Sequence, residues 1–194
     1  MDALEHIVST CGGVFRTADA EALGISRTTI SNYARNGRIE RLAHGIYAVR
    51  DAMVDDLYII QLRSERIIFS HETALWLNGL SDRTPLAIAV TLENGAPVGE
   101  KLRHECVCHY VKRQFVDLGL EHRKTIYGNM VRCYNAERTI CDLVRSERRT
   151  GVEAFFGGIK QYAASKTKNI AELMKMASMF GIEEKVAKYM GVLV

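Results

Sequence analysis

The sequence has only two prolines, and no apolar run approaches the ~20 residues needed to cross a bilayer. Its opening residues, 1–6, lack both the basic start and the apolar stretch of a signal peptide. The 194 residues are 47% hydrophobic and 25% charged, which is typical of a soluble globular chain and argues against extensive disorder. We therefore expect a cytoplasmic protein with no membrane partner.

Cysteine is scarce, and lysine is missing from the first hundred residues. The five cysteines are odd in number and scattered, so they predict small buried side chains rather than a disulfide framework. A net charge of +3 does not by itself indicate a nucleic-acid partner. However, every basic residue before Lys101, histidine apart, is arginine, the residue suited to bidentate contacts with phosphate and guanine.

The usual catalytic and cofactor motifs are also missing, since there is no Walker-type loop, dinucleotide fingerprint or serine-hydrolase elbow. The pair His71-Glu72 resembles a zinc-protease helix, but Leu75 stands where the second histidine ligand is required. The histidines and cysteines within 104–109 are too closely spaced for a tetrahedral structural site. The acids of the C-terminal half show no paired metal-binding motif. We expect no metal site and no enzyme activity.

The sequence predicts an α+β protein. A winged helix-turn-helix is expected over residues 1–50, a linker over 51–56, and a mixed α/β domain over 57–194. In the first segment we expect three short helices and a hairpin, with Thr17 and Ser26 capping the second and third helices. In the later segment the expected elements are a helix over 71–77 capped by Ser70, strands over 86–92, 105–111 and 130–134, a helix over 136–145 capped by Asn135, and a helix whose apolar face runs from 170 to 180.

The strongest local signal lies between residues 20 and 33. A helix-turn-helix needs a small residue where its helices touch, which Ala20 supplies, and a turn residue that tolerates positive φ, which Gly24 supplies. The apolar residues of the segment then fall on the inner face, namely Leu23, Ile25, Ile30 and Tyr33. This register predicts a recognition helix from Arg27 to Asn36.

The same register predicts the surface that would meet DNA. It comprises Ser26, Arg27, Thr28, Ser31, Asn32 and Arg35 on the helix, followed by Arg38, Arg41 and His44 on the wing. Arginine reads guanine, asparagine reads adenine, and basic side chains on a wing bind phosphates. The outward face of the helix carries no acid, and the segment 27–50 has five arginines against Glu40 alone. The alternative use of such a fold is protein contact.

Three stretches of the sequence resemble the AbiEi antitoxins of bacterial abortive-infection toxin–antitoxin systems, a class of phage defence. The first is the winged module with Gly45-Ile46-Tyr47 in its hairpin. The second is the run 70–83, SHETALWLNGLSDR, and the third is the run 134–143, YNAERTICDL. Together they extend over residues 10 to 145.

The resemblance implies that the N-terminal domain binds inverted repeats of double-stranded DNA in its own promoter and represses transcription. It also implies that the C-terminal domain counters a cognate AbiEii-type toxin, a nucleotidyltransferase-like protein, with or without touching it, and that no cofactor is needed. In the third run, Glu137, Arg138 and Asp142 are the antitoxin-domain motif. From spacing alone these three form a capping and salt-bridge set, because residues four apart share one helical face.

Two rival functions stay open at this point. One is a ligand-responsive transcriptional regulator that has no toxin partner and senses its ligand in the C-terminal domain. The other is an enzyme in the C-terminal domain. The basic cluster of Arg145, Arg148 and Arg149 is either a solvated helix end or a second contact for phosphate or a partner.

Overall fold

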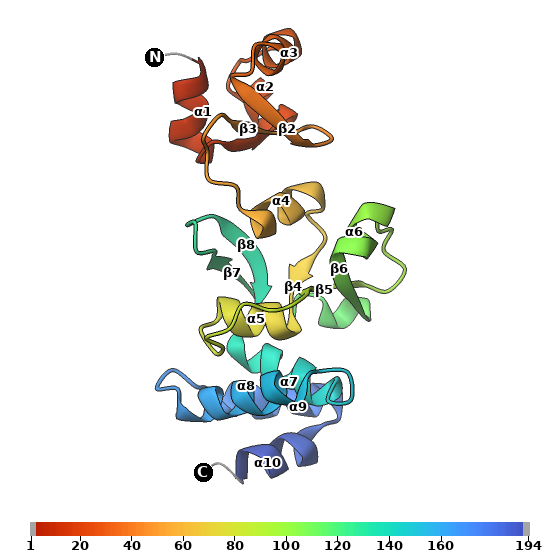
Figure 1. The fold of residues 1–194 in the computed structure, drawn as a ribbon. Helices are drawn as coiled ribbons and strands as arrows, with labels where there is room; N and C mark the ends of the chain where they lie inside the picture. The colour runs from red at the N-terminus through yellow and green to blue at the C-terminus, as the bar shows by residue number, and fades with distance from the viewer. Residues whose placement is uncertain (1–2, 192–194) are drawn as a thin grey trace. The chain divides into compact units, whose positions relative to one another are not determined.

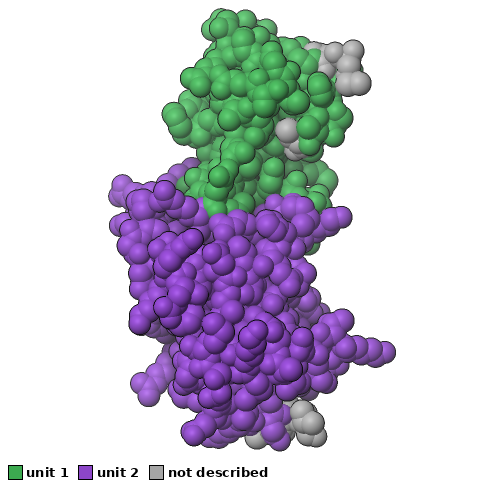
Figure 2. All heavy atoms as spheres, turned by 180° about the vertical axis from the view of Figure 1, so that it is seen from behind, with its two compact units in different colours: residues 1–65, 125–129 green, residues 66–124, 130–194 purple. Residues whose placement is uncertain are grey.

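The computed structural model describes residues 3–191, apart from the side chain of Cys11, and it divides into two compact units (Figures 1 and 2). Unit 1 contains the chain up to residue 65 together with 125–129, and unit 2 contains 66–124 and the chain from 130 onward. This division differs from the expected one, in which 51–56 was a linker. The reason is that Asp55 caps a helix, and this helix belongs to unit 1.

Unit 1 is a helix-turn-helix flanked by a small sheet. Its elements are α1 (Ala3–Cys11), β1 (Val14–Arg16), α2 (Thr17–Ala22), α3 (Arg27–Arg35), β2 (Ile39–Ala43), β3 (Ile46–Val49) and α4 (Asp56–Arg63). The sheet has the order β1-β3-β2, with both pairings antiparallel. The hairpin was predicted from the sequence, whereas strand β1 was not.

The helix-turn-helix has the geometry that the sequence predicts. Ala20 is fully buried, and Gly24 has a φ of +79°, a conformation that costs glycine no strain. Ile30, also buried, joins the same apolar cluster as Phe15, and the ring of Phe15 stacks on that of Tyr47. Burying a side chain such as Ile30 stabilises the fold by ~1.5–3 kcal/mol, so this cluster fixes the position of α3.

Of the two helix caps predicted in unit 1, one agrees with expectation and one differs. The Ser26 side chain accepts a hydrogen bond from the backbone N–H of Thr29 at 3.1 Å, as a capping residue should. Thr17, in contrast, is the first residue of α2 and not its cap. Its backbone N–H donates to the Gly45 carbonyl, and Arg16 occupies the cap position, where its N–H donates to Asp19.

Unit 2 begins with a short strand and ends in a helical layer. Its elements are β4 (Ile68–Phe69), α5 (His71–Leu77), β5 (Ile88–Glu93), α6 (Glu100–Glu105), β6 (Cys106–Val111), a 3-10 turn (Arg113–Phe115), β7 (Leu120–Lys124), β8 (Met130–Tyr134), α7 (Ala136–Arg145), α8 (Val152–Ala164), α9 (Ile170–Phe180) and α10 (Glu183–Gly191). Figure 1 shows α5 and α7 to α10 gathered on one side of the sheet.

The sheet of unit 2 is mixed, with the strand order β6-β5-β4-β8-β7. β5–β6 and β4–β8 are parallel, whereas β4–β5 and β7–β8 are antiparallel. The mixed α/β architecture expected for this segment is therefore present. The expected strand over 86–92 runs from Ile88 to Glu93, and Glu105 ends α6 rather than beginning β6. The short β4 and the charged β7 had no detectable strand pattern.

The core of unit 2 lies between the sheet and the helical layer. Leu75 of α5, Leu143 of α7 and Leu173 of α9 are buried in one apolar cluster. A methyl group added at Gly158 of α8 would approach the Leu75 side chain to within 2.8 Å, so glycine is what lets α8 pack closely there. Among the described residues, no helix is long and apolar enough to span a membrane.

Candidate nucleic-acid interface

The structure exposes every residue predicted to contact DNA. They are Ser26, Arg27, Thr28, Ser31, Asn32, Arg35, Arg38, Arg41 and His44. Six of them lie on α3 or its cap, and three lie on the turn and hairpin that follow. On α3 the buried side chain is Ile30, and Tyr33 also packs against the core, which orients Ser31, Asn32 and Arg35 outward. The helix therefore presents a polar face without an acid of its own.

An acid nevertheless reaches this surface from the preceding helix. The carboxylate of Glu21 in α2 accepts from Nε of Arg27 at 2.6 Å and from its Nη2 at 3.3 Å. The hydrogen bond lowers the pKa of Glu21 and raises that of Arg27. Both side chains are exposed, so the pair adds little to stability. Its consequence is that Arg27 already has an anionic partner on this surface.

Ser26 and Arg41 also have internal partners. The Ser26 hydroxyl holds the first turn of α3 and lies 2.9 Å from Oγ1 of Thr29, so it is engaged as a cap. On the hairpin, Nη2 of Arg41 lies 3.1 Å from Nδ1 of His44, and its Nε donates to the Ala43 carbonyl at 3.3 Å. These contacts hold the guanidinium at the tip of the wing, where it can meet a phosphate.

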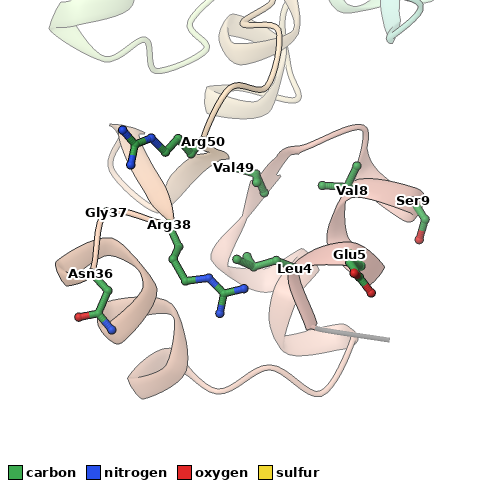
Figure 3. A pocket seen from close by; sticks show the side chains of 9 residues that line it. All are labelled: Leu4, Glu5, Val8, Ser9, Asn36, Gly37, Arg38, Val49 and Arg50. Carbon is green, nitrogen blue, oxygen red and sulfur yellow. The ribbon is translucent and has the colours of Figure 1, made fainter.

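Arg38 occupies a different environment from the other wing residues. Its guanidinium lies over the ring of Tyr33, 4.7 Å from the centroid. It also lines a hollow of about 620 Å³ in unit 1, together with Leu4, Val8 and Arg50 (Figure 3). Figure 3 shows the Arg38 side chain between α3 and α1. The backbone of Arg38 therefore lies in the α3–β2 turn, while its side chain lines this hollow.

Residues 2–50, which form this module, match the family model AbiEi_4, described as "Transcriptional regulator, AbiEi antitoxin". The N-terminal segment is therefore similar to this family. The resemblance inferred from the sequence is thus confirmed for this segment. The two later runs lie outside the matched residues.

Two further comparisons concern the whole chain. The crystal structure of the RV2827C protein from Mycobacterium tuberculosis is similar over 97% of this chain and 75% of its own, with a TM-score of 0.66 and 14% sequence identity. At that identity the likeness establishes the shared α+β fold alone. The comparison with curated proteins found no match.

The residues that the resemblance implies as the antitoxin-domain motif lie inside unit 2. Glu137, Arg138 and Asp142 on α7 are all buried. Nε of Arg138 donates to Asp142 at 3.0 Å, and its Nη1 donates to the carbonyls of Phe115 and Leu118 at 2.7 and 2.8 Å. The motif therefore joins α7 to the segment before β7 and offers no surface for a partner.

Glu137 connects α7 to the two helices that follow it. Its carboxylate accepts from the hydroxyl of Tyr162 and from the backbone N–H of Asn169, both at 3.0 Å. Asn169 is the cap of α9. Burial, followed by the negative charge of Glu137, raises the pKa of Tyr162 above its usual value, so the phenol stays a donor. The carboxylate thus fixes the junction of α8 and α9.

The other AbiEi-like run contains a buried histidine in an unusual conformation. His71 has a φ of +49°, which costs a residue with a side chain of order 1 kcal/mol or more. Its ring nitrogens lie 3.0 Å from the Ser70 hydroxyl and 3.1 Å from that of Ser146, and its ring stacks on His109 with centroids 3.5 Å apart. Burial lowers its pKa to about 4. The sequence indicated a helix start here and gave no sign of the stacked pair.

The remaining polar side chains of that run hold α5 on the sheet. Oγ1 of Thr73 accepts from the backbone N–H of Ala89 at 2.9 Å, and Nδ2 of Asn78 donates to the Tyr134 carbonyl at 2.9 Å. Cys133 and Cys141 are buried as expected, and burial raises their pKa to about 12, so they are not thiolates. In the described part of the chain, no group of three His, Cys, Asp or Glu side chains is arranged around a possible metal position.

Proposed function

We propose that this protein is a DNA-binding antitoxin of an abortive-infection system that represses its own promoter. In this proposal α3 enters the major groove of double-stranded DNA and the β2–β3 wing meets the phosphate backbone. Two copies occupy the halves of an inverted repeat, because one recognition helix covers only a few base pairs. The observation that carries the proposal is the exposed, acid-free face of α3, which continues into an arginine-bearing wing.

The antitoxin activity is assigned to unit 2. We infer that it counters an AbiEii-type, nucleotidyltransferase-like toxin in the cytoplasm and contributes to phage defence. The buried set of Glu137, Arg138 and Asp142 supports this role by maintaining the fold, since none of the three is available to a partner. Direct contact with the toxin would therefore involve other residues of the unit.

A ligand-responsive regulator is the second candidate. The hollow lined by Arg38 favours it, because 620 Å³ lies within the usual range of small-molecule pockets. Unit 2, where the sequence placed the sensor, has a smaller hollow of about 410 Å³ beside Arg148 and Phe156. A regulator of this kind would repress its promoter without rescuing growth from any toxin.

One experiment separates the two candidates. The chain is co-expressed with the product of the adjacent gene, and growth is measured together with a reporter driven by the chain's own promoter. The antitoxin reading expects both rescue and repression. Repression without rescue, at matched protein levels, supports the regulator instead. Loss of both functions from a stably folded chain contradicts the proposal.

A further inference from the structure

The two edges of the sheet in unit 2 differ sharply in chemistry. At one edge, β7 has the sequence Leu-Glu-His-Arg-Lys, and Arg123 pairs with Glu121 at 2.6 Å. Charged side chains of this kind are a common protection of an exposed strand edge against pairing with another chain. At the opposite edge, β6 has the sequence Cys-Val-Cys-His-Tyr-Val and contains no Asp, Glu, Lys or Arg. Only one edge is therefore protected by charge.

The outer side of β6 is open. β6 pairs with β5 along its whole length, from Cys106 opposite Ile88 to Val111 opposite Glu93, and it is the last strand of the sheet. Val107 and Tyr110 are 47% and 45% exposed, although they project from opposite faces of the strand. A strand added along this edge would pair with the outward backbone groups and cover both side chains.

We propose that β6 is the contact between two copies of this chain, whose β6 strands pair antiparallel and join the two sheets. A two-fold axis perpendicular to the sheet relates two edge strands in this antiparallel way, and each copy then offers the same backbone groups to the other. The proposal concerns self-association without DNA. It can therefore fail while DNA binding by a single copy remains.

The charges that flank β6 favour a second copy in this orientation. Glu105 immediately precedes the strand and lies 3.8 Å from Lys101. Lys112 and Arg113 follow the strand, and Arg113 lies 3.5 Å from Glu93. Antiparallel pairing places the beginning of one strand beside the end of the other, so the acid of one copy approaches the bases of its partner at both ends. Parallel pairing would place like charges together, which is unfavourable. These flanking charges therefore favour the antiparallel orientation, in addition to the ion pairs that they form within each copy.

His109 fixes the position of β6 on unit 2. Its ring stacks on the buried His71, which holds the middle of β6 against the body of unit 2. The neighbouring thiol of Cys108 is half-buried and lies close to the middle of the strand. In an antiparallel pair centred near this point, the Cys108 residues of the two copies are either opposite each other or offset by about two residues.

The first test is sedimentation velocity of the full chain at increasing concentration without DNA. We expect a reversible dimer whose Kd rises by roughly tenfold or more in Tyr110→Lys and in Val107→Lys, because each change puts a charged side chain where the proposed contact covers an apolar one. Val152→Lys is the matched control, because Val152 is 74% exposed on α8, and it should leave the Kd unchanged. Circular dichroism and thermal melting establish that each variant folds.

The second test addresses the register. A short bismaleimide should cross-link the dimer through Cys108, and Cys108→Ser should remove the cross-link, whereas Cys133→Ser should keep it. A folded chain that stays monomeric at all concentrations would overturn the proposal. So would a dimer that Tyr110→Lys leaves intact, because the copies would then meet elsewhere. DNA binding to a single half-site, measured in parallel, reports separately on the proposed function.

Discussion

The carboxylate of Glu21 holds the guanidinium of Arg27 at the start of the recognition helix, with Nε 2.6 Å from Oε1. The two residues come from the two helices of the helix-turn-helix and lie on opposite sides of the turn. A carboxylate in this position competes with a DNA phosphate or a guanine for the same donors. If the proposed function holds, this ion pair weakens DNA binding, because Arg27 must exchange Glu21 for a DNA group.

Removal of this acid should strengthen binding. We expect Glu21→Gln to raise the affinity for DNA by about fivefold, with a larger relative gain on random sequences. Fluorescence anisotropy on promoter and random duplexes measures the change. Glu184→Gln on α10, also exposed, is the control for net charge. An unchanged affinity in Glu21→Gln would show that the ion pair does not compete with DNA.

Asn32 and Arg41 should affect binding in different ways. Asn32→Ala should cost about 1–3 kcal/mol on specific DNA and little on random DNA, since a bidentate contact with adenine is lost. Arg41→Ala should weaken both by a similar factor and reduce the salt slope by about one, because a phosphate contact is lost. Titrations over a range of salt concentrations distinguish the two. If Asn32→Ala lowers the affinity for specific and random DNA equally, Asn32 does not recognise a base.

Repression and toxin neutralisation should separate genetically. The double variant Arg27→Ala, Asn32→Ala should lose repression of a promoter reporter while growth rescue persists, because both changes lie on the exposed surface of unit 1. We make this test in the full chain, since residues 57–65 and 125–129 belong to unit 1 and a 57–194 fragment would divide that unit. If this double variant fails to rescue growth at matched abundance, the N-terminal module itself takes part in countering the toxin.

Arg138 should be essential for the stability of unit 2. Arg138→Ala leaves Asp142 without one of its two guanidinium partners and frees the carbonyls of Phe115 and Leu118, so we expect the free energy of unfolding to fall by about 3–5 kcal/mol. Arg148→Ala, on the surface of the same region, should change it by less than about 0.5 kcal/mol. Urea unfolding followed by circular dichroism measures both. Similar stabilities would contradict the structural role of the motif.

The stacked histidines should make stability depend on pH. Burial holds the pKa of His71 at about 4, and Asp142 opposes this shift while His109, Arg145 and Arg138 add to it. Burial also lowers the pKa of His109, again opposed by Asp142 and reinforced by Arg149 and Arg145. The unfolded chain therefore takes up these protons at a higher pH than the folded chain does. The free energy of unfolding should fall as the pH drops from about 6.5 to about 4, by about 3 kcal/mol for His71 alone.

Two measurements check this pH dependence. Urea midpoints at several pH values give the slope, and NMR titration of the His71 ring gives its pKa directly. His122→Asn, at an exposed position on β7, should leave the slope unchanged. A His71 ring that titrates near 6.5 would contradict the prediction, since it would mean that the ring is not held neutral by burial.

The sequence by itself determined the features that depend on neighbouring residues. Ala20, Gly24 and Ser26 lie within seven positions, and the steric and capping preferences of these residues specify the turn and the start of α3. Asn135 specifies the start of α7 in the same way, because its side chain accepts from the N–H of Arg138 only three residues away. The outward face of α3, and with it the candidate interface, follows from helical periodicity.

Only the tertiary structure decided which distant segments meet. The pairing of β1 with β3, the stacking of His71 on His109, and the assignment of α4 to unit 1 depend on contacts between residues far apart in the chain. The spacing of Arg138 and Asp142 indicated an ion pair, but its burial became evident only when the Phe115 and Leu118 carbonyls were seen to face it. Periodicity assigns a residue to a face of its own element, and it carries no information about which other element covers that face.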